Sequence, residues 1–211
     1  MALQFAAAGY HTAVLDYAIC EKAKDYMPLR QLAEYRSCAA ARGPVAYPAG
    51  KNCRVRLFSG RLPALSGAVL DIPGEAAQPR PNAVILGYPV VTAGQYAHRG
   101  SFVQLAGSAD PAAQQVFGLE DKITPQMPPV FVWTTMEDAT VPVENTLMLV
   151  NALHRAGVPC EAHLFEKGVH GTSISTAEVD QPSRHRHHWW NWQWNGWETR
   201  LPFPSVKSGY I

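Results

Sequence analysis

The length, composition and charge of the chain exclude several classes of protein. It has 211 residues, of which 18 are Lys or Arg and 17 are Asp or Glu, so that its formal charge is +1. A charge so close to neutral disfavours a nucleic-acid binder, because such proteins use many cationic side chains to displace counterions from phosphates. The hydrophobic share of 47% disfavours a disordered chain, and the length predicts one domain with its own core.

The cysteines and the start of the chain favour a cytoplasmic protein. Four scattered cysteines form no C-x-x-C pair and no metal-ligand spacing, which is typical of reduced thiols: Cys20, Cys38, Cys53 and Cys160. The first ten residues lack the basic segment and long apolar core of a signal peptide. No apolar run reaches the ~18 residues that a membrane-spanning helix needs, so we expect no membrane partner.

The N-terminal part of the chain predicts three elements and then loses its periodicity. Residues 2–8 resemble the end of a helix, residues 11–17 a buried strand, and residues 28–40 a helix with Pro28 near its start. Between residues 42 and 79, proline and glycine interrupt every periodic pattern, so we expect this segment to be irregular.

The second half of the chain alternates apolar strands with helices. Residues 82–88, 129–135 and 160–165 predict strands, and residues 143–156 predict a helix closed by Gly157. This alternation indicates an α/β fold with a mostly parallel sheet and flanking helices. In such sheets, functional side chains gather in the loops at the carboxyl ends of the strands.

Two of these loops carry residue types suited to acid–base chemistry. Asp138 follows the strand at 129–135, and His170 follows the strand at 160–165, with Gly168 and Gly171 on either side of it. A carboxylate can accept the Nδ1–H of an imidazole and so fix its tautomer, and flanking glycines let the backbone pass through a crowded site. From spacing alone, a turn aspartate and an unrelated loop histidine explain the pattern equally well.

Four segments of the chain resemble bacterial acetyl-esterase/lipase-like α/β hydrolases, a group that includes acetyl xylan esterase-like proteins. These segments are residues 2–17, 80–90, 128–145 and 152–171. The most specific match is D-A-T-V-P-V-E-N at 138–145. The resemblance implies that Asp138 is the acid and His170 the base of a Ser–His–Asp triad. It also implies hydrolysis of a small ester or an acetylated sugar, without a metal or organic cofactor.

The chain departs from that family at the nucleophile. The fold requires G-x-S-x-G on a tight turn between a strand and a helix, and no such motif occurs. The nearest candidate nucleophile is Ser59, which Gly60 follows but which has Leu57 where a glycine is needed. The family's glycine-rich oxyanion loop is also missing, which predicts a loss of about two to three orders of magnitude in rate.

A second departure is the C-terminal segment, in which five of the six tryptophans lie between Trp189 and Trp197. Since Trp has a single codon, reading the codons of this segment with a two-base shift yields an amphipathic helix like the family's closing helix. Residues 45–58 can also be encoded so that a one-base shift yields a string ending in G-F-S. We interpret residues about 40–60 and about 187–211 as out-of-frame translations of an α/β-hydrolase gene. We therefore expect an incomplete α/β-hydrolase domain over residues 1–186, truncated at its N-terminus, and an aberrant Trp/His-rich tail over residues 187–211.

Two other functions remain open from the sequence. The first alternative is a catalytically inactive hydrolase remnant. The second is a binding module that uses the C-terminal tail. There, tryptophan faces would bind sugars or clustered histidines would bind a metal, the histidines being His185, His187 and His188. Glu144 and Asn145 are expected to cap the helix that follows them.

Overall fold

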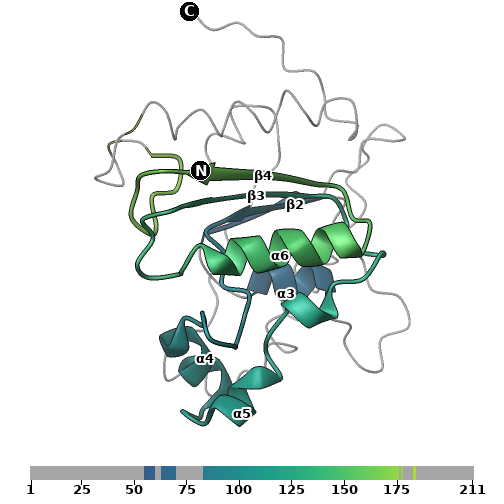
Figure 1. The fold of residues 1–211 in the computed structure, drawn as a ribbon, viewed down its shortest axis with the longest axis vertical. Coiled ribbons are helices and arrows are strands. Elements are labelled where there is room, and N and C mark those ends of the chain that lie inside the picture. Colours follow the sequence, from purple (N-terminus) through teal and green to yellow (C-terminus); the bar gives the residue numbers. More distant parts are fainter. Residues whose placement is uncertain (1–54, 60–62, 70–82, 176, 178–182, 184–211) are drawn as a thin grey trace, which may run out of the picture.

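A parallel sheet forms the centre of the molecule. The computed structural model describes residues 55–59, 63–69, 83–175, 177 and 183 (Figure 1). Four strands of this part pair in parallel in the order β1-β2-β3-β4: β1 (Val55–Ser59), β2 (Ala83–Gly87), β3 (Val130–Thr135) and β4 (Cys160–Phe165). Because the strands are parallel, their carboxyl ends meet at one edge of the sheet.

The connections between these strands are helical. They contain α3 (Pro63–Val69), α4 (Arg99–Ala106), α5 (Pro111–Gln115), the 3₁₀-helix η2 (Glu120–Lys122) and α6 (Glu144–Arg155). Figure 1 shows α3 and α6 side by side along one face of the sheet, whereas α4 and α5 lie further from it. The predicted α/β class, with a parallel sheet and flanking helices, is confirmed.

The two middle strands are buried along their whole length. Every residue of β2 (A-V-I-L-G) and of β3 (V-F-V-W-T-T) is buried, which explains why both read as continuous apolar runs rather than alternating ones. One face of these strands packs on α3 and α6 to form the core, with members that include Val84, Leu86, Val130, Val132, Leu65, Leu149 and Leu153.

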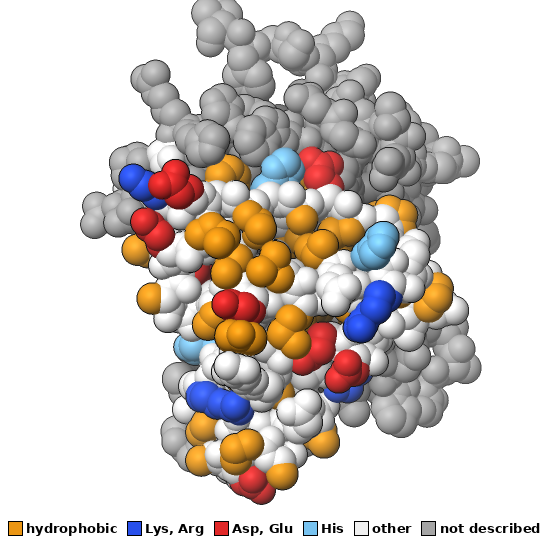
Figure 2. All heavy atoms as spheres, in the orientation of Figure 1, with side chains coloured by type: hydrophobic (Ala, Val, Ile, Leu, Met, Phe, Trp, Pro, Cys, Tyr) orange, Lys and Arg blue, Asp and Glu red, His pale blue; other side chains and the backbone are white. Residues whose placement is uncertain are grey.

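The last strand has a different surface. β4 lies at the end of the order of described strands, and only Phe165 among its residues is fully buried. Leu164 of β4 and Leu147 of α6 are 44% and 46% exposed. Figure 2 accordingly shows hydrophobic side chains gathered across the middle of the visible face, over α6.

The segment that contains α4 and α5 is held by polar contacts between the exposed Arg99, the backbone and the buried Gln114. Nη1 of Arg99 donates to the carbonyl of Ala93 and to Oε1 of Gln114, and its Nη2 donates to the carbonyl of Gly94. Gln114 is itself buried and donates to the carbonyl of Ser108. Phe102 of α4 is fully buried in the core and fixes the helix from the other side.

The strands expected at 82–88, 129–135 and 160–165 and the helix expected at 143–156 are confirmed as β2, β3, β4 and α6. The expectation that residues 42–79 are irregular is wrong at two places, since β1 and α3 lie within them. β1 depends on pairing with β2, in the register Val55↔Ala83 to Ser59↔Gly87, and a non-local partner leaves no periodic signal.

Several predicted elements fall outside the described residues: those at 2–8, 11–17 and 28–40, and the tail at 187–211. The division into a domain at 1–186 and a tail therefore stays a prediction. Within the ranges that the structure describes, no helix is long and apolar enough to cross a membrane.

Candidate active site

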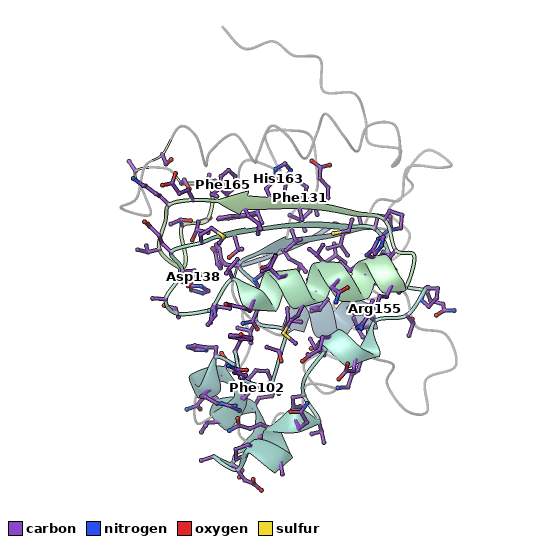
Figure 3. All side chains as sticks on the ribbon, viewed as in Figure 1. Phe102, Phe131, Asp138, Arg155, His163 and Phe165 are labelled. Atoms are coloured by element: carbon purple, nitrogen blue, oxygen red, sulfur yellow. The ribbon has the colours of Figure 1, made fainter. Side chains whose placement is uncertain are left out.

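Two loops meet at the carboxyl edge of the sheet and bring an aspartate against a histidine. Asp138 lies three residues beyond β3, and His170 lies in the loop after the neighbouring β4. Nδ1 of His170 is 2.8 Å from Oδ2 of Asp138. The Asp138 side chain is completely buried, whereas 22% of the His170 side chain is exposed (Figure 3 labels Asp138). The structure thus brings together the two residues that the resemblance named as acid and base.

The loop itself orients the carboxylate. Oδ1 of Asp138 accepts hydrogen bonds from the backbone N–H groups of Thr140 and Val141, at 3.0 and 2.9 Å. This turn follows from the sequence D-A-T-V, because an aspartate readily accepts from amides two and three residues ahead. With Oδ1 committed to the turn, Oδ2 is directed at the imidazole.

The electrostatics keep this carboxylate ionised. Burial raises the pKa of Asp138, but the hydrogen bonds from His170, Val141 and Thr140 and the charge of His170 outweigh burial and hold it below the usual 3.8. An ionised Asp138 can only accept a hydrogen bond, so Nδ1 of His170 carries the proton and donates it, and Nε2 of an imidazole in this tautomer is left as an acceptor. This is the tautomer that a general base requires.

The backbone of the His170 loop uses conformations that favour glycine. Gly168 has φ 144° and Gly171 has φ 85°, on either side of the histidine. A Cβ added at Gly171 would meet nothing within 4 Å, so the glycine serves its dihedral angle and not the crowding that the sequence suggested. Thr135 Oγ1 donates to the carbonyl of Gly168 at 2.6 Å and ties the loop to the end of β3.

Tyr88 is a site residue that the sequence reasoning missed. It follows β2 directly, is 2% exposed and has φ 40°, which is unusual for a bulky residue. Its ring centroid lies 4.6 Å from that of His170 and 4.9 Å from that of Trp133. The available signal was its position: Tyr88 comes directly after an apolar strand, and Asp138 likewise lies in the loop after one.

Asn145 is a buried connector and not the helix cap that we expected. Its Oδ1 accepts from the N–H groups of Val91 and Thr92, and its Nδ2 donates to the carbonyls of Tyr96 and Pro142. Glu144 does begin α6, as expected, but no side chain caps that helix. Asn145 thus joins the segment after β2 to the loop that carries Asp138.

Ser59 ends β1 and pairs through its backbone with Gly87. The next helix, α3, begins at Pro63, so Ser59 lies between a strand and a helix, as a nucleophile elbow does. The structure therefore places the backbone of Ser59 at the same edge of the sheet as Asp138 and His170; it does not describe its side chain. Its partner in the sheet, Gly87, is the residue directly before Tyr88.

Other chemistries find little support among the described residues. Burial and the neighbouring Glu161 raise the pKa of Cys160 to about 11, so its thiol is protonated at neutral pH and is a poor nucleophile. In the described part of the chain, no three His, Cys, Asp or Glu side chains form a group that could hold a metal ion.

Comparison with known proteins shows which sequences and folds this chain resembles. Residues 97–196 match the model of the prolyl oligopeptidase family. A stretch of 101 residues is 41% identical to endo-1,4-beta-xylanase B of Butyrivibrio fibrisolvens and covers 47% of this chain, but only 16% of that protein.

Two solved structures place these matches in a fold. The acetyl ester-xyloside bifunctional hydrolase of Caldicellulosiruptor lactoaceticus is 29% identical, with a TM-score of 0.55 over 64% of this chain and 51% of that one. The carboxylesterase Cest-2923 of Lactobacillus plantarum is 23% identical, with a TM-score of 0.75 over 94% and 78%. The chain therefore has the α/β-hydrolase fold, and it is similar to carboxylesterases and an acetyl ester hydrolase. It spans about half of the bifunctional hydrolase and a smaller part of the xylanase.

Proposed function

We propose that the chain hydrolyses carboxylic esters through an acyl-enzyme, with Ser59 as nucleophile, His170 as base and Asp138 as the acid that orients it. The observation that carries the proposal is the 2.8 Å contact between Nδ1 of His170 and the buried carboxylate of Asp138. A buried carboxylate whose free oxygen is directed at a loop histidine is typical of a functional site, because buried charges are rare unless they are paired.

The reaction has two balanced halves. In the first, Oγ of Ser59 attacks the ester carbonyl while Nε2 of His170 takes the hydroxyl proton and passes it to the departing alcohol. In the second, His170 takes a proton from water, the hydroxide attacks the acyl-enzyme, and the proton returns to Ser59 as the carboxylic acid leaves. Asp138 stays ionised throughout and stabilises the imidazolium, in keeping with its lowered pKa.

The proposed substrates are short acyl esters, such as acetyl groups on sugars. Support comes from the similarity to an acetyl ester-xyloside hydrolase and, over part of the chain, to a xylanase. The reaction needs neither a metal nor an organic cofactor, since serine, imidazole and carboxylate supply all of its proton transfers.

A second candidate function is that of an inactive hydrolase, and Leu57 is the observation that favours it. The elbow requires a small residue two positions before the serine, because the turn is crowded, and this chain has leucine there. We therefore expect any activity to be lower than that of an intact elbow.

Hydrolysis of p-nitrophenyl acetate separates the two candidates. An active chain should lose at least about a hundredfold in kcat on His170→Ala or Ser59→Ala, since nucleophile and base act as a unit. The matched control is His154→Ala, which removes an exposed histidine from the last turn of α6. If activity persists equally in both site variants, the triad assignment is wrong; if the wild-type chain has none above background, the inactive candidate holds.

A further inference from the structure

We propose that Tyr88 is a positioning residue that fixes the orientation of the His170 imidazole. The inference rests on the proposed role of His170 as base, and it concerns how that base is held. The imidazole is attached to its own side chain at Cγ and bonds Asp138 at the adjacent Nδ1, so the far side of the ring, with Nε2, can still move by small rotations. A second contact is needed to direct Nε2 to a fixed point.

The ring of Tyr88 provides that contact. Its centroid lies 4.6 Å from the imidazole centroid with an angle of 65° between the planes, within the range of edge-to-face aromatic pairs. Its hydroxyl oxygen accepts the backbone N–H of Ser173 at 3.1 Å, three residues beyond His170. One side chain therefore holds both the imidazole and the loop that carries it.

Tyr88 is itself held from behind. Trp133 of β3 packs on it edge-to-face at 4.9 Å, and Phe165 of β4 packs on Trp133 at 6.1 Å. Gly87 makes room for this stack, because a Cβ there would lie 3.1 Å from Nε1 of Trp133. In Figure 3, Phe165 lies with Phe131 and His163 on the face of the sheet away from α6, so the stack is part of a row of aromatic side chains on that face.

The backbone of Tyr88 supports a role beyond core packing. A bulky residue at φ 40° persists only where its surroundings fix it, and such positions concentrate at functional sites. In the strand order, the end of β2, which Tyr88 follows, lies between the end of β1, where Ser59 lies, and the ends of β3 and β4. Tyr88 thus follows the strand next to the one that carries the proposed nucleophile, and its ring contacts the proposed base.

Imidazole NMR on the full-length chain tests the proposal without requiring activity. In protein labelled with ¹⁵N-histidine, the Nδ1 proton of His170 should exchange with water at least tenfold faster in the Tyr88→Leu variant than in the wild type. In active protein it should lower kcat at least tenfold and change KM less than twofold. Phe102→Leu is the matched control, since it truncates another buried aromatic residue in α4. It should lower Tm but leave the exchange rate and kcat per folded molecule unchanged.

Tyr88→Phe removes only the hydroxyl oxygen and keeps the buried ring. This variant therefore tests the proposal even if the leucine variant does not fold. We expect the phenylalanine ring to retain wild-type exchange at Nδ1 of His170, whereas the amide of Ser173 should exchange at least tenfold faster and that of Val141 should not change. The proposal is overturned if the Ser173 amide is unaffected, or if Tyr88→Leu behaves like Phe102→Leu. A wild-type chain without esterase activity would refute the proposed function, and the exchange rates would still decide the role of Tyr88.

Discussion

At the scale of single residues, the site depends on how each polar atom is committed. Oδ1 of Asp138 is used by the N–H groups of Thr140 and Val141, which leaves Oδ2 for His170. The spacing of Asp138 and His170 in the sequence left their pairing open, and the resemblance to a known family implied it. The sequence did not predict the role of Tyr88, because that role depends on contacts with His170 and Ser173, far along the chain.

The lowered pKa of Asp138 predicts how stability depends on pH. A carboxyl group whose folded pKa lies below its unfolded value contributes stability above the unfolded pKa, and loses it as pH falls through the folded pKa. We expect the Tm of the wild type to fall more steeply than that of Asp138→Asn below about pH 4, where only the wild type gains this proton. Thermal unfolding followed by circular dichroism across that range measures the difference, and parallel curves would contradict the assignment.

The substitution of Gly171 tests the backbone of the same loop. At φ 85° an alanine is strained although its Cβ has open space, so Gly171→Ala should cost about 1 to 2 kcal/mol in the free energy of unfolding. Urea denaturation measures the cost, with Gly100→Ala as the control, because Gly100 lies inside α4 and has no positive φ. An equal or smaller cost at Gly171 would show that its dihedral angle is unimportant.

At the scale of elements, some of the strands and helices that form the site have a clear local pattern in the sequence, and others depend on partners far along the chain. β2, β3 and α6 follow from apolar runs and helical spacing, so their positions were predicted. β1 was not, because its five residues become a strand by pairing with β2. The link between the loop after β2 and the start of α6 was missed for the same reason, since Asn145 reaches partners more than fifty residues away.

Asn145→Ala should disrupt that link at a large cost. The substitution leaves the buried N–H groups of Val91 and Thr92 without the Asn145 acceptor and removes the side-chain donor to the carbonyls of Tyr96 and Pro142. We expect a loss of about 3 kcal/mol in the free energy of unfolding. Asn151→Ala, an exposed position on the same helix, should cost less than about 0.5 kcal/mol. Equal costs in urea denaturation would show that Asn145 does not hold these two segments together.

At the scale of the whole molecule, the carboxyl edge of the sheet gathers Ser59, Tyr88, Asp138 and His170 from four successive strands and their loops. Strand order alone accounts for this, because parallel strands present all of their carboxyl ends at one edge. The α/β class was therefore predictable from the alternation of elements. The proposed nucleophile, Ser59, left a weaker signal in the sequence, since the chain lacks the first glycine of G-x-S-x-G.

The interpretation of residues about 40–60 and about 187–211 as out-of-frame translations remains a prediction about the gene. It predicts that a single-base correction near each segment restores G-x-S-x-G and an amphipathic closing helix. Independent sequencing of the locus tests it. An intact frame in every read, together with expressed peptides spanning 45–58 and 189–197, would contradict it.

The most direct test of the triad is covalent labelling of the nucleophile. An organophosphate such as paraoxon reacts with a serine only when a base activates it, and trypsin releases Ser59 in a short peptide, L-F-S-G-R, at 57–61. We predict a diethylphosphoryl adduct on that peptide in the wild type, formed at least about a hundredfold more slowly in His170→Ala and at the wild-type rate in His154→Ala. An adduct elsewhere, no adduct, or equal labelling in both histidine variants would contradict the assignment of Ser59, His170 and Asp138 as the catalytic triad.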